Sequence, residues 1–115
     1  MNAAGAWVPG LGPLESAIMT VIWDAGQPLS VRVVRERLDY QAGDGEDPAY
    51  TTVMTVMMVL WRKGFLERAK CPGAGHGRAW WYAACIARED HLATVIRQAL
   101  DCARDPAAVL RRATP

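Results

Sequence analysis

The chain has 115 residues, of which 51% are hydrophobic and 22% are charged. This length favours one domain and argues against a two-domain enzyme, and the apolar fraction is too high for an intrinsically disordered protein. The formal net charge is only +1, but the charges are unevenly distributed. Residues 1–49 carry three basic and seven acidic side chains, whereas residues 50–82 carry five basic and one acidic. This local excess of cations is compatible with nucleic-acid binding.

The sequence also constrains where the protein works. No apolar stretch reaches the roughly 20 residues that a membrane span needs, and no basic segment precedes an apolar one at the N-terminus. We therefore expect neither membrane insertion nor a signal peptide, and a cytoplasmic location. The spacings between Cys71, Cys85 and Cys102 are 14 and 17 residues. These spacings fit neither a disulfide framework nor a zinc motif, so reduced thiols are expected.

The N-terminal third predicts a tail followed by a helix. Residues 1–12 contain three glycines and one proline without a sustained period, which indicates a flexible tail. Pro13 suits the first turn of a helix, in which apolar residues then recur at helical spacing. Gly26 lies where this helix ends.

A second, short helix is expected after Ser30. The Ser30 side chain is placed to cap the helix, and the preceding Leu29 is placed to pack on Val34. The polar residues 41–47 follow and predict an acidic loop.

The third predicted helix, residues 48–63, is the most informative. Asp47 and Pro48 suit its N-cap and first position, and Gly64 suits the residue after its end. At 100° per residue one face is apolar and is expected in the core, namely Ala49, Val53, Val56, Met57 and Leu60. The opposite face carries Thr51, Thr55, Met58 and Arg62, with Thr52 and Lys63 on its shoulder.

Two short strands are expected next, at residues 65–70 and 78–83, joined by the glycine-rich residues 71–77. A β-hairpin that directly follows a helix and has a basic, glycine-rich tip is typical of the wing of a DNA-binding domain.

The last third returns to helix. Its apolar stripe is Leu92, Val95, Ile96, Ala99 and Ala103. Asp105 and Pro106 then suit the start of a short final helix. An amphipathic helix outside a compact domain must bury its stripe, so we expect this region to form a homodimer.

Taken together, the elements predict a mainly α fold with a small β-hairpin wing, that is, a winged helix-turn-helix with C-terminal dimerisation helices. The expected boundaries are residues 1–12 for the tail, 13–84 for the DNA-binding domain and 85–115 for the dimerisation region.

The sequence also resembles the penicillinase-repressor family of bacterial transcription regulators (the BlaI/MecI type). The family's first-helix pattern is matched by Leu14-Glu15, Ile18-Met19 and Ile22-Trp23. Its recognition-helix signature is matched by Tyr50-Thr51-Thr52-Val53-Met54-Thr55-Val56, Leu60 and Lys63-Gly64, and its wing pattern by Gly77-Arg78 and Tyr82.

The resemblance implies a dimeric repressor that binds a palindromic operator. In some family members a membrane sensor protease leads to cleavage of the repressor, which makes such a protease a candidate partner. Asn2 is the only asparagine here, so the Asn-Phe cleavage bond of the best-known members is absent. The family's usual arginine is also replaced by Val59, and the paired cysteines of its copper-responsive members are missing.

The expected DNA-binding residues are Tyr50, Thr51, Thr52, Thr55, Arg62, Lys63 and Arg78. Threonine is a mediocre helix former, so three threonines within five positions suggest a role beyond the helix itself. Their hydroxyl and methyl groups suit base edges and the thymine methyl. The three cations lie where backbone phosphates would run.

Other interpretations remain open. Met54, Met58 and Trp61 could dock a protein partner on a winged-helix interaction module. A thiol- or metal-responsive regulator is a second alternative, because Cys71, His76 and Cys85 could supply zinc ligands. Their irregular spacing argues against a metal site, and we expect no cofactor. The histidines His76 and His91 have no nucleophile and acid at catalytic spacing, so no enzyme is expected.

Overall fold

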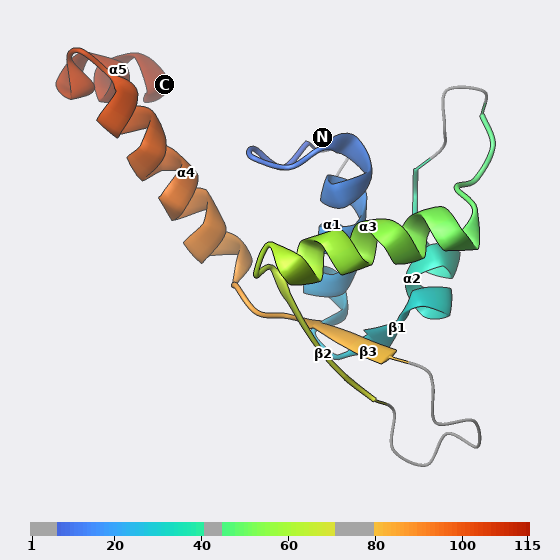
Figure 1. Ribbon diagram of the computed structural model, residues 1–115. Helices are drawn as coiled ribbons and strands as arrows, with labels where there is room; N and C mark the ends of the chain where they lie inside the picture. Colours follow the sequence, from blue (N-terminus) through green and yellow to red (C-terminus); the bar gives the residue numbers. More distant parts are fainter. Residues whose placement is uncertain (1–6, 41–44, 71–79) are drawn as a thin grey trace.

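The computed structural model describes residues 7–40, 45–70 and 80–115. Its elements are α1 (Pro13–Ala25), β1 (Leu29–Ser30), α2 (Val31–Arg37), α3 (Tyr50–Arg62), β2 (Leu66–Lys70), β3 (Trp80–Ala84), α4 (Arg88–Cys102) and α5 (Pro106–Ala113). The first three helices pack with a three-stranded antiparallel sheet of order β1-β3-β2, and α4 extends away from this body (Figure 1). Three helices followed by a hairpin form a winged helix, so the predicted winged-helix fold is confirmed. The dimerisation role expected of the C-terminal helices stays a prediction.

The core lies between the three helices and the inner face of the sheet. Its fully buried side chains include Ile18, Met19, Val34, Val53, Met57, Leu60, Leu66 and Tyr82. The expected core stripe of α3 is confirmed at three of its five positions, because Val56 is only half-buried and Ala49 is exposed.

The end of α3 follows the expectation from its sequence. Gly64 has a φ of +88°, which favours glycine, and its N–H donates to the Trp61 carbonyl at 3.1 Å. The Phe65 N–H donates to the Leu60 carbonyl at 3.0 Å, which completes the hydrogen-bond pattern of a glycine-terminated helix. This turn directs the chain from α3 straight into the wing.

The start of α3 differs from the expectation. Asp47 and Pro48 suit a helix start in the sequence, but the helix begins at Tyr50 with Ala49 as an N-cap that makes no side-chain bond. The Pro48 carbonyl instead accepts a hydrogen bond from Arg35 Nε at 2.9 Å. This tertiary contact from α2 holds residue 48 outside the helix.

Ser30 caps α2 as expected, with its Oγ accepting from the Val33 N–H at 3.2 Å. Ser30 and Leu29 also form β1, which was not predicted. Leu29 pairs with Tyr82 and Ser30 pairs with Trp81. A two-residue strand is too short to show alternation, and only its pairing with β3 reveals it.

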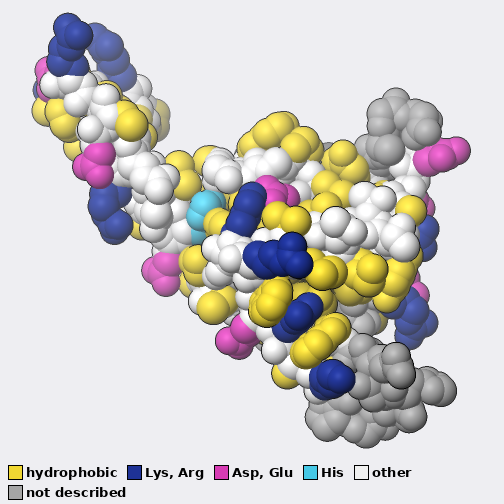
Figure 2. Space-filling model, in the orientation of Figure 1, with side chains coloured by type: hydrophobic (Ala, Val, Ile, Leu, Met, Phe, Trp, Pro, Cys, Tyr) yellow, Lys and Arg dark blue, Asp and Glu magenta, His cyan; other side chains and the backbone are white. Residues whose placement is uncertain are grey.

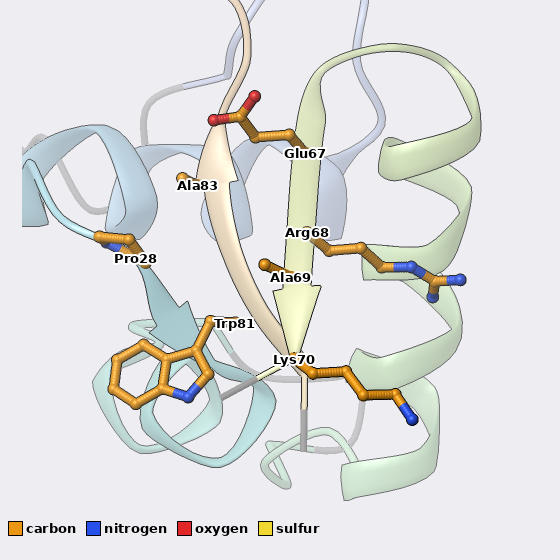
Figure 3. A pocket seen from close by; sticks show the side chains of 7 residues that line it. All are labelled: Pro28, Glu67, Arg68, Ala69, Lys70, Trp81 and Ala83. Carbon is orange, nitrogen blue, oxygen red and sulfur yellow. The ribbon is translucent and has the colours of Figure 1, made fainter. Parts of the chain in front are cut away.

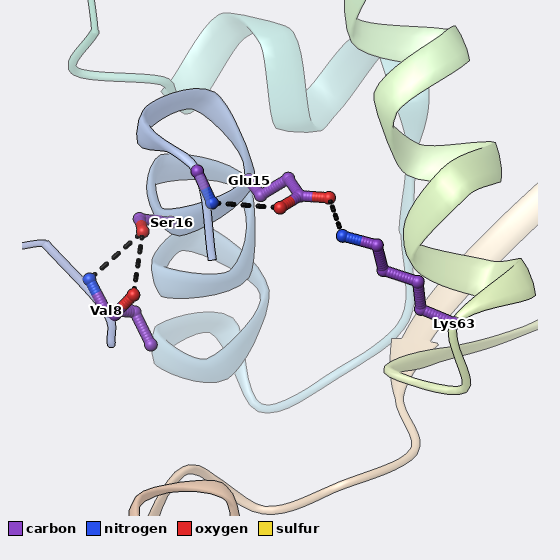
Figure 4. A network of polar contacts seen from close by, with 5 residues as sticks. Val8, Glu15, Ser16 and Lys63 are labelled. Carbon is purple, nitrogen blue, oxygen red and sulfur yellow. Dashed lines mark hydrogen bonds and ion pairs between the residues drawn. The ribbon is translucent and has the colours of Figure 1, made fainter. Parts of the chain in front are cut away.

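The expectation of a flexible tail is wrong for the described residues 7–12. Val8 and Leu11 are buried in the core. The hydroxyl of Ser16, itself buried, lies 3.0 Å from the Val8 nitrogen and accepts its hydrogen bond (Figure 4). This segment therefore belongs to the folded body. Residues 1–6 lie outside the described residues, as do residues 41–44 of the expected acidic loop and residues 71–79, which include the expected wing tip.

The helix α4 projects from the body and makes the molecule elongated, with extents of 56 × 32 × 20 Å. Its radius of gyration is 16.4 Å, compared with about 13 Å for a compact chain of 100 residues. Asp105 caps α5 as expected, accepting from the Ala108 N–H at 3.2 Å. No described helix has the length and apolar character needed to cross a bilayer.

The contact between Ser16 and the N-terminal segment gives a stability prediction. Ser16→Ala removes the partner of the buried Val8 N–H and is expected to lower the free energy of unfolding by about 1–3 kcal/mol. Urea denaturation would measure the change. The control is Thr94→Ala, since the Thr94 hydroxyl bonds only to its own helix at the Asp90 carbonyl. If Ser16→Ala, like the control, stays within about 0.5 kcal/mol of the parent, this hydrogen bond contributes nothing measurable to stability.

Candidate nucleic-acid interface

The helix α3 presents a polar face to solvent. Its expected DNA-contacting residues Tyr50, Thr51, Thr52, Thr55 and Arg62 are all exposed. The helix of 13 residues is about 20 Å long. One rigid element therefore displays hydroxyl and methyl groups along its length and a guanidinium at its C-terminal end.

The two threonines in the middle of this face are linked. The Thr55 hydroxyl donates to the Thr51 carbonyl at 2.9 Å. Because its hydrogen is committed to the helix, the Thr55 oxygen can only accept a further hydrogen bond. Its methyl group remains available for apolar contact, so Thr55 suits an amino group or a thymine methyl on a base edge.

A stack of aromatic and cationic side chains joins the end of α3 to the wing. The Arg68 guanidinium lies 3.7 Å from the ring centre of Trp61 and 4.2 Å from that of Trp80. Lys70 Nζ lies 5.6 Å from the Trp80 ring centre. Figure 2 shows dark blue side chains interleaved with yellow ones across this region. Each ring attracts the cation above it, so the stack restrains Arg68 without neutralising its charge.

The sequence analysis did not predict this stack, because it treated Arg68 and Lys70 only as part of the local excess of positive charge. The alternation of side chains along the two strands could have predicted part of it. Arg68 pairs with Tyr82 and Lys70 pairs with Trp80, which places all four residues on one face of the hairpin. Trp61 comes from α3, however, and its position over Arg68 depends on the tertiary fold.

The ion pairs separate the cations into two groups. Arg32 pairs with Glu36 at 3.7 Å, and Lys63 pairs with Glu15 at 2.8 Å. Within residues 7–40, 45–70 and 80–115, Arg62, Arg68 and Lys70 take part in no ion pair. Their charges are therefore free to meet an anion. Arg78, also expected at this surface, lies outside the described residues.

Lys63 is positioned differently from Arg62. Its ammonium group reaches back to α1, where Glu15 also accepts a hydrogen bond from the Gly12 N–H at 2.9 Å (Figure 4). Burial raises the pKa of the Glu15 carboxyl, but the hydrogen bonds from Gly12 and Lys63 and the Lys63 charge outweigh it, so that the pKa is lowered overall. Lys63 thus has a structural partner.

The outer face of the wing holds a separate, apolar pocket of about 490 Å³. Trp81 and Pro28 lie on one side of it, and Ala69 and Ala83 form its floor, whereas the Arg68 side chain points toward α3 (Figure 3). This pocket and the cationic stack therefore lie on opposite faces of one hairpin.

Some residues of the expected dimerisation stripe are half-buried within the subunit, and others are exposed. Leu92 and Val95 are half-buried near the N-terminal segment, and Ala103 is half-buried near the end of α4. Ile96 is 56% exposed, and Ala99 is also exposed. Val109 and Leu110 on α5 add further exposed apolar surface. The outer half of α4 and α5 thus present an uncovered apolar surface.

The other candidate groups have simpler roles. His91 is buried, with Nε2 2.7 Å from the Pro9 carbonyl oxygen, and packs edge-on against Phe65. Because a carbonyl only accepts, His91 donates from Nε2. Cys85 and Cys102 are free, exposed thiols. Cys71 and His76 lie outside the described residues, and the described ones contain no cluster of metal-ligating side chains.

Comparison with known proteins identifies the family. Residues 11–113 match the penicillinase repressor family. The chain belongs to this family. Two relatives, each named transcriptional regulator BlaI and each from a strain of Mycobacterium tuberculosis, are 36% identical over 95 residues. The aligned region covers 83% of this chain and 62% of each relative, so the chain spans less than two thirds of their length. The resemblance seen in the helix and wing motifs is confirmed.

The lowered pKa of Glu15 gives a pH prediction. Its contribution to stability is present above the ordinary value of 4.5 and is lost as the pH falls through the lower value of the folded state. Glu15→Gln should therefore be less stable than the parent at pH 7, and the difference should shrink below pH 4.5. Thermal unfolding over a pH series would measure it, with Glu67→Gln as control. A difference independent of pH would contradict the assignment.

Proposed function

We propose that this chain is a transcriptional repressor, without enzymatic activity, that binds double-stranded operator DNA as a homodimer in the cytoplasm. The observation that carries the proposal is the exposed face of α3, where Thr51 and Thr55 lie on the same helix as Arg62, which has no ion-pair partner among the described residues. Membership of the penicillinase repressor family supports it.

In this proposal α3 enters the major groove. Thr51, Thr52 and Thr55 contact base edges, where hydroxyl and methyl groups can distinguish base pairs. Tyr50 lies at the start of the helix and is 47% exposed, so it can reach the sugar-phosphate backbone or a base at one end of the site.

The cations hold the backbone. Arg62 lies at the end of α3, and Arg68 and Lys70 continue along the wing. Because these three lack ion-pair partners among the described residues, approaching phosphates displace only small counterions and break no salt bridge. Lys63 contributes less, since a phosphate must compete with Glu15, and Arg78 is proposed as a further wing contact.

The dimer is proposed to form through α4 and α5. Two α3 helices must lie about one helical turn of DNA apart to read two half-sites, which requires a two-fold partner. The uncovered side chains Ile96, Ala99, Val109 and Leu110 supply an apolar surface for this contact. A two-fold dimer then reads a palindromic operator.

The alternative of a protein-interaction module is less well supported. Trp61 is a docking residue in that alternative, but Arg68 covers one face of its ring at 3.7 Å. A gel shift with fragments selected from genomic DNA decides between the two functions. The repressor requires selective, salt-sensitive binding, and the absence of any selected fragment would favour the interaction module.

Substitutions at Thr55 test the reading of bases. Thr55→Val keeps the methyl group and removes the hydroxyl, whereas Thr55→Ser does the reverse. We expect one of the two to cost about 1–3 kcal/mol on particular base pairs and to show which group makes the contact. Binding to a panel of single-base operator variants would measure it. Unchanged discrimination in both variants would show that α3 does not read the operator through Thr55.

Arg62 tests the backbone contact. Arg62→Ala is expected to weaken binding to all sequences alike and to reduce the slope of log affinity against log salt by about one per subunit. Arg97→Ala, on the exposed part of α4, is the matched control. Equal slopes for the two variants would place Arg62 away from phosphate.

Ile96 tests the dimer. Ile96→Glu puts a charge on the uncovered apolar surface and is expected to give monomers with unchanged helical content and at least tenfold weaker operator binding. Analytical ultracentrifugation and circular dichroism would measure both. The control is Gln98→Glu, which adds the same charge to an exposed polar position on the outer half of α4. A parent protein that is monomeric both free and on DNA would overturn the dimer.

A further inference from the structure

A second pocket lies between α3, the start of α2 and the wing. Its volume is about 610 Å³, within the range of small-molecule sites. The helix contributes Tyr50, Met54 and Met58, which follow one another at four-residue spacing, and the wing contributes Arg68, Trp80 and Tyr82.

The walls of this pocket are apolar and adaptable. Met54, Met58 and Trp80 are half-buried, so their side chains are still accessible from the pocket. Thioethers are flexible and polarisable and make favourable contacts with aromatic rings. A planar ring lying between the methionines and the indole would therefore be well accommodated.

The charged groups at the pocket are cationic. Arg68 and Arg32 belong to the lining, and the described lining residues include no Asp or Glu. Arg32 shares its charge with Glu36 in an exposed pair at 3.7 Å, whereas Arg68 is held between Trp61 and Trp80. Arg68 Nη1 makes one long hydrogen bond, to the Tyr82 hydroxyl at 3.5 Å. A guanidinium has five N–H donors, so others can donate to an anion.

We propose that this pocket binds a small aromatic anion, such as an aryl carboxylate, with its ring against Met54, Met58 and Trp80 and its charge on Arg68. A DNA phosphate could satisfy Arg68 but has no apolar body to place against the two methionines. A wall of methionines beside a restrained cation fits a ligand that has both an aromatic ring and a negative charge.

The position of the pocket links this ligand to regulation, a step that rests on the proposed function. Most of its lining comes from α3 and the wing, the parts proposed to contact DNA, and the remainder from Ser30, Val31 and Arg32. When an anion is bound to Arg68, this side chain is no longer available to a DNA phosphate. Ligand and DNA must therefore weaken each other's binding by the same factor. The pocket would then be a site through which a small molecule releases the repressor from its operator.

Isothermal titration calorimetry of the full chain with 2-naphthoate, in the absence of DNA, tests the site. We expect saturable binding at one site per subunit, and at least tenfold weaker binding of the neutral analogue 2-naphthylmethanol. Arg68→Gln should weaken naphthoate binding at least tenfold, and Met58→Gln should weaken both compounds. Arg97→Gln, an equal change on the exposed part of α4, should leave binding unchanged.

The outcomes that overturn the proposal are distinct from those that overturn DNA binding. Absence of saturable naphthoate binding, or equal binding to the parent and Arg68→Gln with native circular dichroism in both, removes the site whether or not the protein binds DNA. Titration of naphthoate into a complex with a selected DNA fragment tests the coupling. Release of the DNA supports it, and unchanged DNA affinity at saturating naphthoate overturns it.

Discussion

The arrangement of this molecule depends on how the central strand β3 is paired. Tyr82 lies opposite Leu29 of β1 on one side and opposite Arg68 of β2 on the other, and its side chain is buried in the core. A shift of one residue in either register would turn Tyr82 to solvent and Trp81 into the core. The burial of one large side chain thus sets the position of the wing against α3.

That register also creates the functional surface. With Tyr82 directed inward, Arg68 and Trp80 are on the same inner face, where Trp61 of α3 completes the stack. The Arg68 Nη1 lies 3.5 Å from the Tyr82 hydroxyl, a long contact that adds little energy. The orientation of Arg68 therefore comes chiefly from the two indole rings, which leave its charge available.

The N-terminal segment and α4 depend on each other in a similar way. His91 of α4 donates to the Pro9 carbonyl, and Arg88 pairs with Asp24 at 2.7 Å. The indole of Trp23 donates to the Ile86 carbonyl at 2.9 Å, just before α4 begins. These contacts hold the first turns of α4 to the body and direct its outer half, with Ile96, into solvent. An apolar surface held in that position is suited to a second subunit.

Local patterns in the sequence were enough to determine much of this protein. The helical period identified α1 and α3, Gly64 marked the end of α3, and Ser30 and Asp105 marked two helix starts, because each signal acts through neighbours within a few residues. The motif from Tyr50 to Val56 was enough to indicate the family. The glycine-rich residues 71–77 and the short runs on either side of them also located the two wing strands to within two residues at each end.

What the sequence could not determine are contacts between residues far apart in the chain. The sequence of residues 7–12 suggests a tail, but in the structure Val8 is hydrogen-bonded to Ser16. Pro48 similarly suggests the start of a helix, but its carbonyl accepts a hydrogen bond from Arg35. Lys63 and Arg62 are equivalent cations in the sequence, yet only Lys63 reaches Glu15, 48 residues away. Propensity and spacing describe local preferences of about 1 kcal/mol, and tertiary packing overrides them wherever a buried partner lies elsewhere in the chain.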